Sequence, residues 1–312
     1  MKILKRIFAV CLALLLLSVA GGYFYFNKKL TPPDNYLNVS GRSATVPIKW
    51  VSSETNQHAA VLLPVKITGL SQLFYMQLDF GSPVTVFYSK PLMSLKAIYP
   101  GIVQLDSSNE IASLAFEVDA LKISSSQFKV LDYGTEINFD STLAENIIGT
   151  IGTDLLEKRI ISLDFKNGNC SFFTDVHEDG FHDFEFKKRK ILLPAKVGGK
   201  SLKLMYDSGT SGYQLIINKS LWEQYKNNET QYITEKGNSW GNRLTVITAS
   251  ADKQIQFGAA RLNLTQVTYI EGTSKIQNLL MKRSGMQGMI GNKLFLNSRV
   301  ILDCKKGKFK VE

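Results

Sequence analysis

Two aspartates, Asp79 and Asp207, each begin a short sequence of the form Asp-x-Gly followed by a hydroxyl residue. The two sequences read Asp79-Phe80-Gly81-Ser82 and Asp207-Ser208-Gly209-Thr210. Two carboxyl groups held close together share one proton, because ionising both at short range is costly. The ionised group can then take a proton from water while the protonated group polarises an amide carbonyl. We therefore predict that Asp79 and Asp207 are a catalytic pair that activates water.

The residues around each aspartate suit this chemistry. Gly81 and Gly209 allow the backbone to approach the carboxyl groups closely. We expect the hydroxyls of Ser82 and Thr210 to donate hydrogen bonds to the outer carboxylate oxygens. These residues and Ser208 are the predicted supporting residues of the two loops.

An internal repeat places the two aspartates at matching points. Residues 61–69 (VLLPVKITG) recur as residues 191–199 (ILLPAKVGG), ahead of Asp79 and Asp207 respectively. Residues 149–155 (GTIGTDL) are echoed by residues 288–294 (GMIGNKL). An isolated Asp-Gly is usually only a turn. A repeat that carries a carboxylate to the same point twice favours a functional interpretation.

The pattern between these landmarks predicts an all-β chain with few helical turns. Runs of β-branched and aromatic residues, mostly bounded by Gly, Ser, Asn or Pro, predict strands. Only short stretches read as helical, at residues 155–158, 221–225 and 294–296. Asp164 and Asp303 also repeat, but each precedes a Lys- and Gly-containing turn, so we interpret them as hairpin residues. The predicted boundaries are residues 1–30, a tether at 31–60, a first lobe at 61–173, a linker at 174–190 and a second lobe at 191–312.

The N-terminal region predicts a membrane anchor. Residues 7–26 contain no charged side chain and follow Lys2, Lys5 and Arg6. A cleaved signal peptide is the alternative, with residues 18–20 as a small-residue cleavage site. The aromatic run at residues 23–26, followed by Lys28 and Lys29, favours an uncleaved anchor. Either way we expect the rest of the chain outside the cytoplasm, periplasmic or extracellular, or secreted.

Composition excludes several other classes of function. Lys and Arg outnumber Asp and Glu by 37 to 27, but no basic stripe with interleaved aromatic residues predicts nucleic-acid binding. The basic run at residues 187–190 is interpreted as a solvated linker face. Neither the cysteine nor the histidine spacing indicates a metal site, and we expect no cofactor. In an oxidising compartment, Cys170 and Cys304 permit one disulfide.

The two Asp-x-Gly-[Ser/Thr] sequences, each with a later Ile-Gly pair, resemble those of the pepsin-like and retropepsin-like aspartic proteases. The resemblance covers roughly residues 61–172 and 191–311. It implies two similar β-barrel lobes related by a pseudo-two-fold axis, each of retropepsin size. It also implies that a peptide or protein substrate lies extended in the cleft between the lobes. In that family a hydrophobic-Gly element threads beneath each aspartate, and the matching residues here are Ile151, Gly152, Ile290 and Gly291.

The chain departs from the family's pattern at one position. The second residue of the usual triplet carries a hydroxyl that cross-links the two loops; Ser208 keeps this hydroxyl, and Phe80 does not. Two hypotheses follow. The first is an aspartic endopeptidase that cleaves exported or surface proteins. The second is a catalytically inactive peptide-binding or scaffolding module with the same lobes. The family also brings its terminal strands together, so a disulfide between Cys170 and Cys304 is conceivable.

Overall fold

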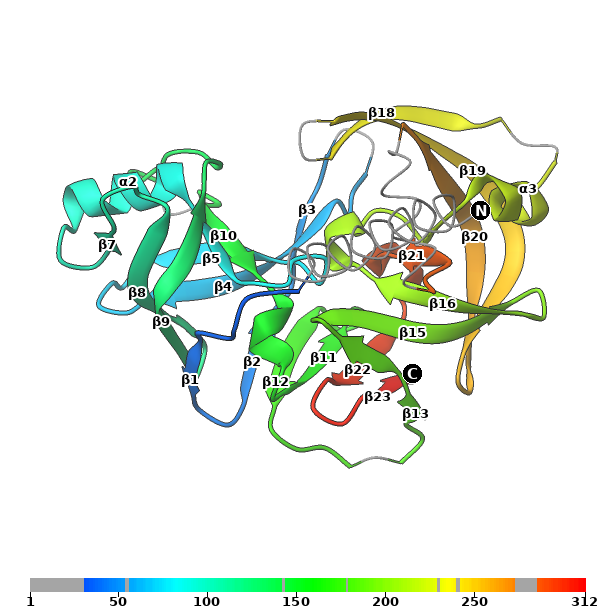
Figure 1. The fold of residues 1–312 in the computed structure, drawn as a ribbon, viewed down its shortest axis with the longest axis horizontal. Helices are drawn as coiled ribbons and strands as arrows, with labels where there is room; N and C mark the ends of the chain where they lie inside the picture. The colour runs from blue at the N-terminus through cyan, green and yellow to red at the C-terminus, as the bar shows by residue number, and fades with distance from the viewer. Residues whose placement is uncertain are drawn as a thin grey trace, which may run out of the picture. The chain divides into compact units, whose positions relative to one another are not determined.

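The computed structural model describes residues 31–53, 56–141, 144–177, 179–228, 231–239, 242–272 and 285–312. The chain from Tyr36 to Glu312 forms one compact unit and is mostly β, as predicted (Figure 1). The predicted anchor at residues 7–26 lies outside the described residues. Among those that are described, no helix has the length and apolar character needed to span a bilayer.

The first half of the compact unit is built on one large sheet. Its strands lie in the order β1-β9-β6-β10-β5-β4-β8-β7, with β3 beside β4. Side chains of a strand point alternately to the two faces of its sheet. In β8 (Ile111–Val118), for example, every second side chain is buried. The other elements are β4 (Ala60–Ile67), β5 (Leu73–Leu78), β6 (Val86–Tyr88), α2 (Ser89–Ile98), β7 (Gln104–Leu105), β9 (Leu121–Leu131), β10 (Ile147–Ile151) and the 3₁₀ helix η1 (Thr153–Leu156).

The second half is built on another sheet, with the strand order β14-β15-β16-β21-β17-β20-β19-β18. Its elements are β14 (Glu185–Lys187), β15 (Lys190–Val197), β16 (Lys200–Tyr206), η2 (Ser208–Thr210), β17 (Leu215–Ile217), α3 (Lys219–Tyr225), β18 (Ile233–Ser239), β19 (Asn242–Phe257), β20 (Ala260–Glu271), β21 (Gly288–Ile290) and η3 (Asn292–Phe295). The pairing repeats that of the first sheet. In each half the strand before the aspartate runs parallel to the strand that ends in the Ile-Gly pair, β5 with β10 and β16 with β21.

A six-stranded sheet joins the two halves, in the order β13-β23-β22-β11-β12-β2. At its centre β11 (Ile160–Asp164) pairs antiparallel with β22 (Arg299–Asp303), and Ser162 faces Ile301. The outer strands are β12 (Asn169–Phe173), β23 (Lys308–Val311), β2 (Ala44–Pro47) and β13 (His182–Asp183). Asp164 and Asp303 close the hairpins, as predicted, by accepting bonds from the backbone N–H groups of Asn167 and Lys305.

The disulfide considered from the sequence is absent. Cys170 and Cys304 are both free thiols, and both are buried. Burial raises the pKa of each thiol, so these cysteines behave as small core residues.

The predicted tether and linker contain short strands that were not predicted. Residues 38–51 form β1 (Asn38–Ser40), β2 and β3 (Lys49–Val51), which pair with β9, β12 and β4. Ala44 and Val46 of β2 are buried in the core, and Val39 and Trp50 of β1 and β3 pack against it. Residues 182–187 form β13 and β14. In the basic run Lys187, Lys188 and Lys190 are exposed, as predicted for a solvated face, whereas Arg189 is only 5% exposed.

Two helical segments were not predicted, η2 and the longer α2. The sequence pattern predicted helical turns only at residues 155–158, 221–225 and 294–296, whereas α2 directly follows β6. Its N-cap, Tyr88, makes no side-chain capping bond and its first turn contains Pro91, so the sequence gives no strong start signal. The three shorter helical segments were predicted within two residues of η1, α3 and η3.

Candidate active site

Asp79 and Asp207 each lie at the carboxyl end of a central strand. Asp79 follows the last residue of β5, and Asp207 follows the last residue of β16. The Asp79 N–H donates to the Ile151 carbonyl at 3.1 Å, and the Asp207 N–H donates to the Ile290 carbonyl at 2.9 Å. The Ile-Gly segments therefore fix the backbone of both aspartates in the same way.

The two Asp-x-Gly loops lie against each other. A Cβ atom added to Gly81 would lie 2.7 Å from Asp207 Oδ1, and one added to Gly209 would lie 2.6 Å from Asp79 Oδ1. Each carboxyl group also accepts a bond from the N–H of its own glycine, at 2.8 Å for Gly81 and 2.9 Å for Gly209. Glycine is thus required at both positions because the opposite carboxyl group occupies the space of a side chain.

The other two glycines of the repeat, Gly152 and Gly291, pack against the backbone that follows each aspartate. A Cβ atom on Gly152 would collide with the Val84 carbonyl, and one on Gly291 would collide with the Thr210 carbonyl. Close backbone packing at these points explains why a residue without a side chain follows Ile151 and Ile290. The structure therefore brings all four glycines of the two motifs around the two aspartates.

Burial and mutual repulsion govern the charge of the pair. Burial raises the pKa of Asp79, and hydrogen bonds from the loop backbone partly offset this effect. Burial also raises the pKa of Asp207, and the nearby Asp79 charge raises it further, to about 7. Two buried carboxyl groups this close together share a proton, and the two causes that act on Asp207, burial and the Asp79 charge, favour Asp207 as its carrier.

A single hydroxyl cross-links the two loops. The Ser208 Oγ accepts a hydrogen bond from the Phe80 N–H at 2.8 Å and donates one to the Leu78 carbonyl at 2.9 Å. Phe80 makes no reciprocal bond because its side chain has no polar atom. Its ring is 1% exposed and packs edge-on against Tyr206, with the ring centroids 5.1 Å apart. An apolar contact thus takes the place of the second cross-link.

The cross-link predicts a stability effect. Ser208→Ala is expected to lower the free energy of unfolding by about 2–4 kcal/mol, because it leaves the buried Phe80 N–H and Leu78 carbonyl without their partner. Denaturant unfolding of the two proteins measures the difference. Ser107→Ala, at an exposed serine, is the control and should change little. A Ser208→Ala variant as stable as the wild type would show that the cross-link contributes nothing.

The hydroxyls of Ser82 and Thr210 do not make the predicted bonds to the carboxyl groups. The Ser82 Oγ donates to the Val84 carbonyl at 2.7 Å, and the Thr210 Oγ1 donates to the Asp207 carbonyl at 2.9 Å. Each hydroxyl can donate only one hydrogen bond, and here it donates that bond to a backbone carbonyl of its own loop. These residues therefore shape the turns, while backbone N–H groups contact the carboxylates.

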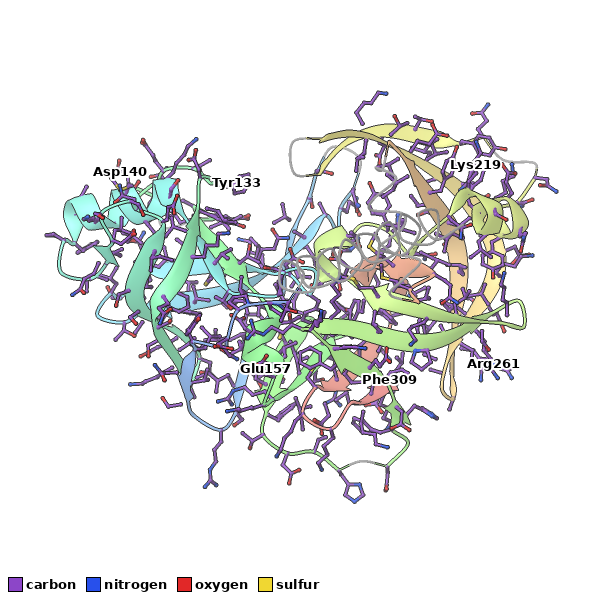
Figure 2. All side chains as sticks on the ribbon, in the orientation of Figure 1. Tyr133, Asp140, Glu157, Lys219, Arg261 and Phe309 are labelled. Carbon is purple, nitrogen blue, oxygen red and sulfur yellow. The ribbon has the colours of Figure 1, made fainter. Side chains whose placement is uncertain are left out.

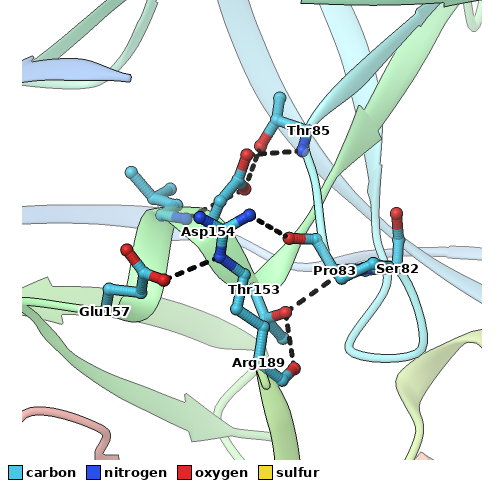
Figure 3. Close-up of polar contacts among 8 residues, drawn as sticks. Ser82, Pro83, Thr85, Thr153, Asp154, Glu157 and Arg189 are labelled. Carbon is cyan, nitrogen blue, oxygen red and sulfur yellow. Dashed lines mark hydrogen bonds and ion pairs between the residues drawn. The ribbon is translucent and has the colours of Figure 1, made fainter. Parts of the chain in front are cut away.

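Polar residues that the sequence analysis missed hold the two loops from outside. In the first half, Asp154 accepts bonds from the Thr85 N–H and Oγ1, both at 2.7 Å (Figure 3). In the second half, the Tyr206 hydroxyl donates to Asn292 Oδ1 at 2.7 Å, and the Asn292 amide donates to Ser211 Oγ at 2.8 Å. Asp154 and Asn292 both lie just after the Ile-Gly pairs, which is the one sequence signal that points to them.

Aromatic residues lie beside the first loop. Tyr88 contributes its hydroxyl to a bond of 2.7 Å with Thr150 Oγ1, and its ring contacts Tyr133 at 4.9 Å. Tyr133 is 65% exposed and lies at the surface after β9 (Figure 2). Burial raises the pKa of Tyr88.

No cluster of His, Cys, Asp and Glu able to hold a metal occurs in the described part of the chain. A comparison with models of known protein families finds no match, and a comparison with curated proteins finds none either.

Proposed function

We propose that this protein is an aspartic-type endopeptidase that hydrolyses peptide bonds through a water molecule activated by Asp79 and Asp207. The observation that supports it most is the reciprocal contact of the two loops, in which each carboxyl group lies against the glycine of the other Asp-x-Gly. Turn formation alone requires no such contact between segments more than 120 residues apart.

The same proposal describes the fold as two acid-protease-like lobes related by a pseudo-two-fold axis. The matching strand pairings of β5 with β10 and of β16 with β21 support it. The central pair of the six-stranded sheet supports it as well, since Ile161 faces Leu302 while Leu163 faces Val300. An axis through the Ser162–Ile301 pair exchanges these two contacts.

In the proposed mechanism Asp207 carries the proton of the pair and Asp79 is ionised. Asp79 accepts a proton from water as the water attacks the scissile carbonyl carbon. Asp207 donates its proton to the carbonyl oxygen, which stabilises the charge that develops there and gives a tetrahedral diol. Asp79 then gives its proton to the amide nitrogen while Asp207 takes a proton from a diol hydroxyl, and the C–N bond breaks to release the amine and the carboxylic acid. The backbone N–H groups of Gly81 and Gly209 keep the carboxyl groups in place throughout. No metal or organic cofactor takes part in these steps.

The proposed substrate is a peptide or an exported protein bound in an extended conformation between the lobes. An extended chain adds to sheet edges through its backbone and presents its side chains alternately to either side. The apolar segment at residues 7–26 would hold the enzyme on a membrane, with residues 31–312 outside the cytoplasm.

The second hypothesis, an inactive peptide-binding or scaffolding module, is favoured by one observation. Phe80 removes a hydroxyl cross-link, so one of the two loops has fewer polar contacts to the other. Peptide binding without cleavage is the result that would distinguish this module from an enzyme.

Cleavage of a random peptide library by the purified protein tests the proposal. Incubation from pH 3 to 8, followed by mass spectrometry, is expected to show internal cleavage. Cleavage should be blocked by a peptide analogue that carries a hydroxyl group in place of the scissile carbonyl, since this analogue resembles the tetrahedral transition state. Binding of the analogue with no cleavage at any pH would favour the inactive module instead.

The rate is expected to follow a bell-shaped pH profile. Catalysis needs exactly one proton on the pair, so the rate falls at low pH as Asp79 becomes protonated and at high pH as Asp207 loses its proton. Because the pKa of Asp207 is raised to about 7, the alkaline limb should lie near neutrality rather than in the acid range. Initial rates with one library-derived peptide in constant-ionic-strength buffers measure the profile. A rate that continues to rise above pH 8 would contradict the assignment.

A further inference from the structure

Arg189 occupies an unusual place for an arginine. It and Lys188 form the two-residue turn between β14 and β15, and both have positive φ, at 59° and 50°. Residues other than glycine, asparagine and aspartate seldom adopt this conformation, which costs about 1 kcal/mol or more per residue. The side chain of Arg189 is nevertheless 4% exposed, so a strained turn carries a buried cation. Strain of this kind is retained where the surrounding contacts require it.

The buried guanidinium contacts the first half of the molecule. Its Nε donates to Glu157 Oε1 at 2.7 Å, and its Nη1 donates to the Pro83 carbonyl at 3.1 Å. The Arg189 carbonyl in turn accepts a bond from Thr153 Oγ1 at 2.7 Å. Figure 3 shows these contacts converging on residues of the Asp79 loop and on η1. Pro83 lies four residues after Asp79 and directly follows Ser82.

The surrounding bonds join Arg189 to the rest of the Asp79 loop. Thr153 also contacts the Ser82 carbonyl, through its N–H at 2.9 Å and its Oγ1 at 3.1 Å. Asp154, the next residue, holds the N–H and hydroxyl of Thr85. The carbonyls of Ser82 and Pro83 and the donors of Thr85 are thus all held by one network. Arg189 is the member of this network that comes from the second half.

These contacts add polar links between the halves at Pro83, three residues after Phe80, which has no hydroxyl. Ser208 cross-links the halves with two hydrogen bonds, and a hydroxyl at position 80 would have supplied a reciprocal set. The Arg189 side chain supplies one hydrogen bond of this kind, donated to the Pro83 carbonyl, and the ion pair with Glu157, while its backbone carbonyl accepts a bond from Thr153. A buried guanidinium requires partners for its donors, and replacing Arg189 would remove its bonds to the Pro83 carbonyl and to Glu157.

We propose that Arg189 is a positioning residue that holds the Asp79 loop against the Asp207 loop, in place of the cross-link that Phe80 cannot make. The proposal rests on the proposed endopeptidase function. It predicts that replacing Arg189 lets the Asp79 and Asp207 carboxyl groups move apart. No group that contacts substrate is removed.

The test compares Arg189→Met and Arg189→Lys with the wild type in the full-length protein, using the best-cleaved library peptide. The hydroxyl-containing peptide analogue titrates the active sites, so that kcat is expressed per folded, competent molecule. We expect Arg189→Met to lower kcat by about tenfold or more with KM within about twofold, because misplacing a reacting group affects the chemical step. Arg189→Lys keeps the charge but not the fork of donors, and should give an intermediate loss.

Two further readouts separate positioning from general stability. If Asp79 moves away, its charge raises the pKa of Asp207 less, so the alkaline limb of the pH profile should move down by about one pH unit. Arg159→Met is the matched control, since Arg159 is also a buried arginine, 8% exposed, and donates to the Gly41 carbonyl rather than to the loop. This control is expected to lose stability but to keep its kcat per active site and its pH profile.

The outcome for Arg189 can be decided even if the proposed function fails. Absence of cleavage by the wild type would overturn the endopeptidase. The carboxyl titration of ¹³C-labelled Asp207 by NMR then replaces the rate profile, since it does not depend on catalysis. A lower titration midpoint in Arg189→Met or Arg189→Lys, but not in Arg159→Met, supports the positioning role. An unchanged midpoint and, in an active enzyme, an unchanged kcat per site would overturn it.

Discussion

Replacing either Asp79 or Asp207 with asparagine is expected to lower kcat for peptide cleavage by about 10³-fold or more, since general acid–base groups contribute on the order of 10²–10⁴-fold each. An amide can neither accept the proton of the attacking water nor return it to the leaving amine. The two carboxyl groups exchange these roles during the cycle, so each variant loses both halves of the reaction. Single-turnover assays with the best-cleaved library peptide measure the loss.

The fold should survive these substitutions. Asparagine has nearly the same shape as aspartate, and its carbonyl oxygen can still accept the N–H bond of Gly81 or Gly209. Because the pKa of Asp207 is raised in the folded state, the folded protein binds this proton more tightly than the unfolded chain does. The free energy of unfolding therefore decreases as pH rises from about 4 to about 7, and Asp207→Asn should remove part of this decrease.

A carboxylate of the same repeat provides the control for both variants. Asp164 is a hairpin residue that accepts a hydrogen bond from the Asn167 N–H and has no part in the proposed reaction. Asp164→Asn should therefore leave kcat unchanged. Unaltered cleavage by Asp79→Asn would exclude the proposed pair altogether. A loss of cleavage accompanied by loss of fold, seen in the circular dichroism spectrum, would contradict the expectation that asparagine preserves the fold.

The repeat made the centre of the site predictable from the sequence. Asp79, Asp207 and the glycines of the two motifs lie where matching landmarks place them, because backbone crowding at these points tolerates only one residue type. The β character was predictable for a similar reason, since alternation of buried and exposed side chains is visible in segments such as β8.

The supporting residues were not predictable, because their partners are distant in the chain. Arg189 lies in a run of four basic residues, and nothing local distinguishes it from its exposed neighbours. Its burial depends on Glu157 and on the Pro83 carbonyl, which only the folded chain brings near. The strands of residues 38–51 were missed for a related reason: they add to the edges of sheets made by other segments and contribute few core residues of their own.

Gly209→Ala is expected to lower activity strongly although it removes no functional group. The added Cβ would lie 2.6 Å from Asp79 Oδ1, 2.8 Å from Cγ and 2.9 Å from Oδ2, so the whole carboxyl group must move. The Asp79 carboxyl group is also held by the Gly81 N–H at 2.8 Å, and a shift would stretch this bond. A displacement of this size should lower kcat/KM by about 10²-fold, because the reacting groups need near-exact placement.

The matched substitution in the other loop should behave alike. A Cβ on Gly81 would lie 2.7 Å from Asp207 Oδ1, so Gly81→Ala is expected to cause a loss of similar size. Gly101→Ala is the control, since no heavy atom lies within 4 Å of the added Cβ and its backbone requires no positive φ. Progress curves and thermal unfolding of the three variants provide the measurement. Full activity in Gly209→Ala would mean that the carboxyl group of Asp79 does not lie against the opposite loop in the working enzyme. The reciprocal contact would then no longer support the proposed function.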